Sequence, residues 1–276
     1  SSAESDVYKR QLEEYTIENM GKPLDFDAVV TNAPFCVRTG EGIPKHKTQF
    51  RSADRYFIDT SLDHCKDGGM VAMIVHSSVM NAKNPAAKDF RERMLARAEV
   101  VDSFRLPGEA FDHSHTQPIT DVIFLRKRDS RVGNALLELQ KQGVLEEKLE
   151  ALGAWDSGFV NAEYYEDKPE RILGKAMTSE ETGWRDKVTG DPEKVASLIE
   201  ELSKKKIESG SLDAAATPIS HDQLLELGEL NTVVKEAMEI AQGRIDEELA
   251  PPELGNVKTV EGTRYLYVGE PPKWTK

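Results

Sequence analysis

The sequence predicts an α/β fold, because short apolar segments alternate with segments of helical periodicity along its first half. Four apolar segments have strand length and are bounded by Gly, Pro or polar residues: 26–31, 70–75, 100–106 and 119–125. Strands that alternate with helices favour a mostly parallel sheet covered by helices. No helix separates the last two segments, so we expect the final strand to pair antiparallel.

Helices are expected before and between these strands. Segments 4–20, 52–65 and 85–98 carry apolar residues at roughly helical spacing. The segment 32–50 is rich in Pro, Gly and polar residues and is expected to be a long loop. Long loops of this kind in compact domains are commonly functional or mobile.

For the second half of the chain, the sequence predicts a mainly helical region that ends in a hairpin. Expected there are a helix at 134–152, an irregular stretch at 155–190, a charged helix at 192–207, a small-residue linker at 209–218, a long helix at 220–249 and a hairpin of 257–260 with 265–268. We therefore divide the chain into an α/β part at 1–130, a helical and irregular extension at 131–208, a linker at 209–219 and a C-terminal part at 220–276.

Composition limits the class of protein. Of the 276 residues 38% are hydrophobic, and the mean hydropathy is −0.53. No apolar run approaches the roughly 20 residues that span a bilayer, so we expect no membrane association. Cys36 and Cys65 are too few for a disulfide framework or a zinc site, so we expect reduced thiols in a cytoplasmic protein and no metal.

The net charge of −13 opposes DNA binding by the whole surface, since such binding depends on neutralising phosphates. A local basic patch can still contact DNA. Candidates for phosphate contact are Lys45, His46, Lys47 and Arg51, which also suit an ordinary solvated loop. The basic run at 126–131 is expected to end a strand, with DNA contact as the alternative.

The string Thr31-Asn32-Ala33-Pro34-Phe35 is the candidate functional motif. It follows an apolar strand, and open α/β sheets bind ligands at the carboxyl ends of their strands. The side-chain oxygen of Asn32 can accept a hydrogen bond from an exocyclic amino group, and the backbone carbonyl of Ala33 can accept a second. Phe35 can stack on a ring, so the set suits a flipped-out nucleobase.

This motif resembles the Asn-Pro-Pro-Phe/Tyr motif of DNA adenine-N6 methyltransferases. Further strings are similar to that family in order and spacing: Asp54 to Leu62, Gly68 to Val75, Val101 to Pro107, Ala110-Phe111 and Thr120 to Lys127. The segment from Val160 to Gly174 resembles large phage- and plasmid-borne proteins that join a methylase-like domain to a helicase and act in antirestriction. The resemblance covers roughly residues 5–205.

The resemblance implies part of a class I, Rossmann-like methyltransferase sheet with direct methyl transfer from S-adenosylmethionine to an amino nitrogen. Asn32, Ala33, Pro34 and Phe35 would form the target-base pocket. Two features depart from the family. Ala33 replaces a proline, which loosens the turn by one fixed φ, and no Gly-rich donor-binding motif follows any strand here.

We therefore expect the target-base half of such an enzyme, which needs a donor-binding segment. The alternative is a catalytically inactive, methylase-derived structural or interaction protein of a phage particle or an antirestriction assembly. A weaker reading is a DNA-binding module without chemistry. DNA would be bound weakly by this chain alone, and the setting would be a bacterial host cell or phage particle. The strand at 26–31 would be a bare apolar edge, so we expect the chain's own helices, its hairpin or another polypeptide to cover it.

Overall fold

A computed structural model describes residues 25–33, 52–114, 118–183, 186–208 and 219–249, together with three short C-terminal strands. The helix expected at 4–20, most of the loop expected at 32–50 and the linker at 209–218 lie outside the described residues.

The first half of the chain forms the predicted mixed sheet. Its strands are β1 (Phe26–Asn32), β2 (Cys65–His76), β3 (Ala98–Leu106) and β4 (Thr120–Lys127), in the spatial order β1-β2-β4-β3. β1 pairs parallel with β2, and β4 pairs antiparallel with both β2 and β3. Three strands therefore run one way and the final strand runs against them, which confirms the predicted sheet. The sequence did not indicate that β4 lies between β2 and β3.

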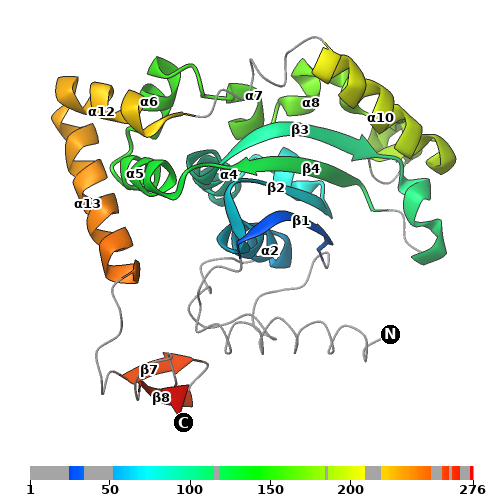
Figure 1. Ribbon diagram of the computed structural model, residues 1–276. Coiled ribbons are helices and arrows are strands. Elements are labelled where there is room, and N and C mark those ends of the chain that lie inside the picture. The colour runs from blue at the N-terminus through cyan, green and yellow to red at the C-terminus, as the bar shows by residue number, and fades with distance from the viewer. Residues whose placement is uncertain are drawn as a thin grey trace.

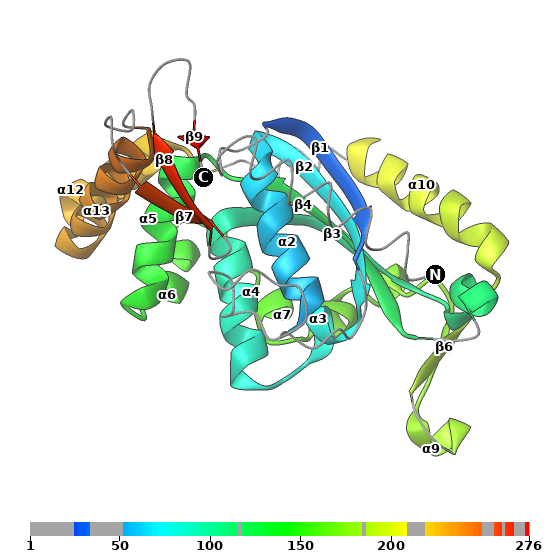
Figure 2. The same ribbon diagram turned by 90° about the horizontal axis from the view of Figure 1, so that it is seen from below.

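Two helices cover one face of the sheet, α2 (Ala53–His64) and α4 (Pro85–Arg97), as Figures 1 and 2 show. They pack on alternate residues of β2, of which Val71, Met73 and Val75 are buried. α4 begins where Asn84 caps its first turn through a side-chain bond to the backbone N–H of Ala87. The short helix α3 (Ser78–Asn81) joins β2 to α4.

Two helices that were predicted to be continuous are each divided into two in the structure. The helix expected at 134–152 is divided into α5 (Ser130–Lys141) and α6 (Leu145–Ala151), because Gly143 adopts a left-handed conformation with φ +74°. The helix expected at 220–249 is divided into α12 (His221–Leu230) and α13 (Thr232–Leu249). Asn231 is extended there, and its side chain accepts from the backbone N–H of Val233.

The stretch expected to be irregular contains short elements. They are α7 (Ser157–Val160), α8 (Tyr164–Asp167), η3 (Pro169–Arg171), α9 (Ser179–Thr182) and an antiparallel pair of β5 (Lys175–Met177) and β6 (Lys187–Thr189). The helix η2 (Gly108–Ser114) precedes β4, and α10 (Pro192–Glu208) confirms the charged helix. The C-terminal hairpin is confirmed as β7 (Val257–Val260) with β8 (Thr263–Tyr267), followed by β9 (Trp274–Thr275).

The main core joins the sheet to α5, α6, α8 and α13, and a smaller second cluster of Phe104, Leu106 and Leu173 packs against α10. One buried cluster joins Val71 of β2 to Leu136 of α5, Leu149 of α6, Tyr164 of α8 and Val234 of α13. The division at residue 130 stays a prediction, and the core crosses it. Among the described residues, no helix is long and apolar enough to cross a membrane.

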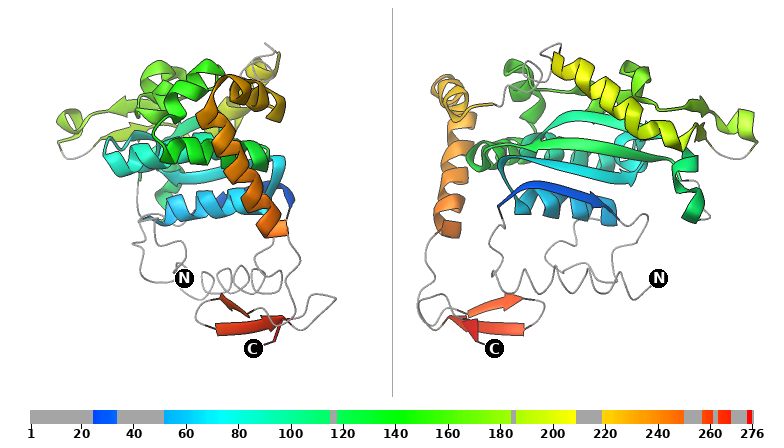
Figure 3. Two further views of the ribbon diagram at one scale, coloured as in Figure 1. Left: turned by 90° about the vertical axis from the view of Figure 1, so that its left-hand side faces the viewer. Right: turned by 45° about the vertical axis from the view of Figure 1, so that its right-hand side comes forward.

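The arrangement leaves one end of the sheet distinct from the helical lobe. The carboxyl ends of β1, β2 and β3 point to the same side in Figure 1, whereas α5, α6, α12 and α13 gather at the opposite end. The views in Figure 3 agree with this separation. The carboxyl edge, where α/β sheets place ligand sites, is thus separate from that lobe.

Candidate functional site at the carboxyl edge of the sheet

The structure places the first two residues of the candidate motif at this edge. Asn32 is the last residue of β1 and is exposed, and Ala33 follows it with 2% exposure. The remaining candidates lie outside the described residues: Pro34, Phe35, Lys45, His46, Lys47 and Arg51. Their roles stay predictions.

Ala33 is held more firmly than the sequence suggested. Its backbone N–H donates to the carbonyl of Ile74 over 3.1 Å, and its methyl group belongs to the main core. A proline at this position has no N–H to donate, so the family's residue could not form this bond. The bond extends the β1–β2 pairing by one residue, and the expected loosening of the turn is offset here.

β2 ends beside this motif with His76, Ser77 and Ser78. Asn32 lies opposite Ile74 in the parallel ladder, so His76 is two residues further along the neighbouring strand. The backbone N–H of Ser78 donates to Nδ1 of His76 over 3.2 Å, and the Ser78 hydroxyl lies 3.0 Å from the same nitrogen. His76 directly follows an apolar strand, where ligand sites form, but the sequence alone favours a structural polar residue at this position.

Thr120 lies opposite His76 in β4. Its side chain is fully buried, and its Oγ1 has no hydrogen-bond partner in the described part of the chain. The next residue, Asp121, is also fully buried but is paired with Arg105 through two bonds of 2.9 and 3.1 Å. Burial raises the pKa of Asp121, and its bonds to Arg105 oppose that shift.

A second buried carboxyl belongs to α2. Asp54 lies in the first turn of α2 with 2% exposure, and its Oδ1 has no hydrogen-bond partner among the residues that the structure describes. Burial raises the pKa of Asp54 to about 6, which the charge of Arg55 opposes. Arg55 itself donates to the carbonyl of Ala86 in the first turn of α4.

The segment at 160–174 anchors the sheet from the side of β3. The Tyr164 hydroxyl donates to Asp102 over 3.1 Å and accepts from the backbone N–H of Ser103. Tyr165 and Ser103 share a hydroxyl–hydroxyl bond of 2.7 Å, and Arg171 donates to Asp102 over 2.9 Å. These contacts fix the segment to the buried middle of β3 and give it a structural role.

The basic run after β4 is engaged in contacts within the chain. Arg128 is buried and donates to Glu99 over 3.0 Å and to the carbonyl of Leu95 over 2.9 Å. Lys127 donates to the carbonyl of Cys65, and Arg131 pairs with Asp129. These contacts support the role of ending a strand over that of contacting DNA.

The outer strand β1 is open on the described part of the molecule. Val30 is 81% exposed and Phe26 is 45% exposed. The helices among the described residues therefore leave these side chains of β1 exposed, and coverage of the strand by another polypeptide stays a prediction. Its last residues still belong to the candidate edge, so an apolar surface adjoins the site.

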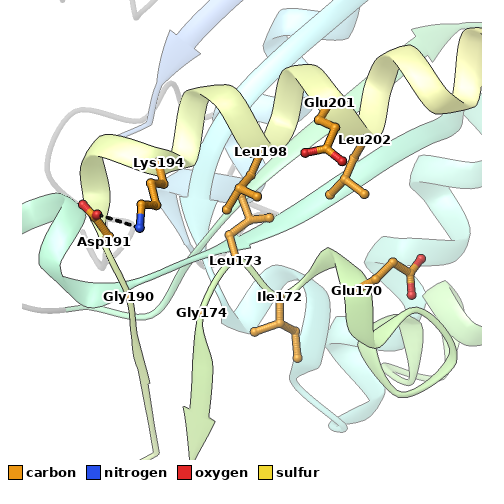
Figure 4. Close-up of a pocket in the computed structure, with 10 residues that line it drawn as sticks. All are labelled: Glu170, Ile172, Leu173, Gly174, Gly190, Asp191, Lys194, Leu198, Glu201 and Leu202. Atoms are coloured by element: carbon orange, nitrogen blue, oxygen red, sulfur yellow. Dashed lines mark ion pairs between the residues drawn. The ribbon is translucent and has the colours of Figure 1, made fainter.

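A cavity of about 390 Å³ lies elsewhere, between α10 and the base of the β5–β6 pair. Figure 4 shows Leu173, Leu198 and Leu202 facing it, with the Lys194–Asp191 ion pair at one end. It shares no residue with the edge formed by Asn32 and His76. We therefore assign it no part in the candidate site.

Residues 2–110 match the model of the Eco57I restriction-modification methylase family. The matched range includes β1, β2, β3 and the Asn32–Ala33 edge, and it is less than half of the chain. The resemblance to restriction-modification methylases is thus confirmed for these residues. The extension beyond residue 110 is not part of this match.

One similar protein is Defense against restriction protein B of Escherichia phage P1. It is 29% identical over 149 residues, which is 54% of this chain and 6% of that protein. Two solved structures are also similar. The M protein of the type I restriction enzyme EcoKI is 21% identical with a TM-score of 0.32, and the match covers 40% of this chain and 22% of that one. The methyltransferase subunit of a type I restriction-modification system from Streptococcus thermophilus is 17% identical with a TM-score of 0.31, and the match covers 51% of this chain and 38% of that one. The chain thus spans a small part of the relatives it matches.

Among the described residues, neither β2 nor β3 is followed by the Gly-rich turn that would hold the methyl donor implied by this family resemblance. A nucleoside donor in an α/β sheet is held by a Gly-rich turn between a strand and the helix after it. Within the described chain, β2 is followed by His76-Ser77-Ser78 and a four-residue helix, and β3 by Pro107 and η2. We derive no step through S-adenosylmethionine from these residues.

Proposed function

We propose that this chain supplies the target-base half of an adenine-N6 DNA methyltransferase, which becomes active when a donor-binding segment is joined to it. The observation that carries the proposal is the position of Asn32 and Ala33. They end β1 at the carboxyl edge, and the family match includes them. The exposed amide of Asn32 is free of the core and suits an amino group presented by a base.

The chemistry asked of these residues is positioning. Asn32 Oδ1 and the Ala33 carbonyl would accept the two amino hydrogens of the flipped base and hold its nitrogen in line with an incoming methyl group. The bond from the Ala33 N–H to Ile74 stabilises that carbonyl's orientation. S-adenosylmethionine would supply the methyl group from the joined segment. The reaction would take place in the cytoplasm of a bacterial host.

The open strand β1 is the proposed junction with that segment. An exposed strand edge pairs readily with another strand, and Val30 presents an apolar side chain beside it. Val30→Lys would place a charge on this surface without disturbing the core. We expect it to weaken association with the donor-binding segment while the chain's own stability stays within about 0.5 kcal/mol. Equal association of both forms would reject the junction.

The experiment that tests the function compares the chain alone with a chain extended by a donor-binding segment of the matched family. Transfer of labelled methyl groups to adenine-containing DNA is measured for both, with Asn32→Ala as the matched variant. We expect transfer only in the extended chain and its loss in Asn32→Ala. No transfer in either form would favour the alternative.

The alternative is an inactive, methylase-derived interaction protein in a phage particle or antirestriction assembly. Ala33 in place of the family's proline and the apolar face at Val30 favour it. It predicts stoichiometric incorporation of the chain into a particle or complex, by quantitative mass spectrometry. It also predicts that Val30→Lys reduces incorporation and that Asn32→Ala does not.

A further inference from the structure

His76 lies on the same face of the sheet as Asn32. Laterally paired residues of parallel strands direct their side chains to one face, and so do residues two apart in a strand. Asn32 is paired with Ile74, and His76 is two residues beyond it. The rise and spacing of β-strands separate the two Cα atoms by roughly 8 Å. Side chains of this length can converge on a single planar ligand.

The hydrogen bonds of His76 fix which nitrogen carries the proton. The backbone N–H of Ser78 can only donate, so Nδ1 must accept, and the proton of the neutral imidazole lies on Nε2. Burial lowers the pKa of His76, with the charge of Asp121 opposing and that of Arg105 reinforcing the shift. The ring is therefore neutral at physiological pH. Nε2–H has no hydrogen-bond partner among the described residues.

Thr120 is a second sign that this part of the edge is not arranged for stability alone. It lies opposite His76 in the β2–β4 ladder, and its buried hydroxyl has no partner in the described part of the chain. Leaving a buried hydroxyl without a partner costs about 1–3 kcal/mol. Most buried polar groups in folded proteins are paired, and exceptions cluster where function requires them.

We propose that His76 is a specificity-determining contact for the target base, and that its Nε2–H donates to the ring nitrogen next to the amino group held by Asn32. The inference rests on the proposed function and adds a substrate contact to it. Adenine presents such an acceptor, N1 or N7, on either side of its amino group. Asn32 would accept a hydrogen bond from the amino group while His76 donates one to the ring nitrogen. The two side chains together would recognise a base that carries a hydrogen-bond donor next to an acceptor.

Deaza bases test this contact directly, because they replace one ring nitrogen by C–H and leave the amino group in place. The probe is a short single-stranded oligodeoxynucleotide with one adenine, 1-deazaadenine or 7-deazaadenine among thymines. Its Kd for the full chain is measured by fluorescence anisotropy at low salt. The wild type should lose about 5–10-fold in affinity for one of the two analogues, as expected for one hydrogen bond.

The variants separate contact from structure. His76→Ala should weaken adenine binding by the same factor and abolish the difference between adenine and the analogue, whereas His76→Gln, which retains an N–H donor, should restore part of it. Lys83→Ala is the matched control, since Lys83 is nearby in sequence and exposed, and its one ion pair among the described residues is with Glu166. It should leave the discrimination unchanged.

Two outcomes overturn the inference. An equal deaza penalty in the wild type and His76→Ala, or no penalty in either, removes His76 from base recognition. If the extended chain still methylates adenine in that case, the proposed function stands without His76. If the full chain binds none of the oligonucleotides and the extended chain transfers no methyl group, both fail together.

Discussion

Arg91 offers the sharpest test of how the carboxyl edge is supported. The residue is 1% exposed, and its guanidinium donates to three backbone carbonyls: Val160 in α7 at 3.0 Å, Val79 in α3 at 3.1 Å and Ala82 after α3 at 2.9 Å. Burial lowers the pKa of Arg91 to about 10, so it remains charged at neutral pH. One side chain of α4 thus holds the helix that directly follows His76.

Arg91→Met keeps most of the aliphatic volume and removes all three donors. Each carbonyl left buried and unpaired lowers the free energy of unfolding by about 1–3 kcal/mol. Part of this loss is offset, because the variant no longer has to bury a charged guanidinium. We expect the free energy of unfolding to fall by about 3–5 kcal/mol. Urea denaturation followed by circular dichroism measures it.

Lys88→Met is the matched control in the same helix, because Lys88 is exposed and its one side-chain interaction within the described residues is a 3.9 Å ion pair with Glu92. It should change stability by no more than about 0.5 kcal/mol. Arg91→Lys, which keeps the charge with fewer aligned donors, should fall between the two and remains measurable if Arg91→Met does not fold. Equal stability of Arg91→Met and Lys88→Met would refute the reasoning.

Three further predictions concern the edge. The pKa of Asp54 is raised to about 6 in the folded state, whereas the unfolded chain has the ordinary value of about 4. Stability is therefore highest below about pH 4, where the carboxyl is protonated in both states, and falls as the pH rises through 6. Asp54→Asn should therefore be more stable than the wild type by up to about 3 kcal/mol at pH 8, with the gap closing towards pH 4, and a gap independent of pH in thermal melts would contradict this. Ala33→Pro should lower stability by about 1 kcal/mol through loss of the bond to Ile74, and a gain in denaturant titrations would show that the bond contributes nothing. Thr120→Val removes an unpaired hydroxyl at constant shape and should leave stability equal or raise it by about 1 kcal/mol, whereas a loss above about 1 kcal/mol would reveal a partner for that hydroxyl.

The strands of the sheet, the antiparallel direction of the last one and the position of the motif could be predicted from the sequence. The strands around Val71 and Ile123 could be predicted because their residues are buried, and buried strands appear in the sequence as short apolar segments. The insertion of β4 between its neighbours could not be read, because pairing order depends on contacts distant in sequence. The breaks at Gly143 and Asn231 were missed because each interrupts an otherwise continuous helical pattern at a single residue.

The candidate site was predicted in part. Asn32 and Ala33 were identified from the strand that precedes them, and both lie at the predicted edge. His76 and Thr120 were not assigned, since a polar residue at a strand end is commonly structural and only the β2–β4 register brings these two together. The hydrogen bond of Ala33 to Ile74 was likewise invisible, because it depends on the parallel register of β1 with β2.

Methyl transfer by the extended chain tests the central claim most directly. Labelled methyl incorporation into adenine-containing DNA is measured for the 276-residue chain, for the chain joined to a donor-binding segment and for the joined chain carrying Asn32→Ala. The account predicts incorporation into the amino group of adenine by the joined chain alone. Incorporation that survives Asn32→Ala, or turnover by the 276-residue chain by itself, would contradict it.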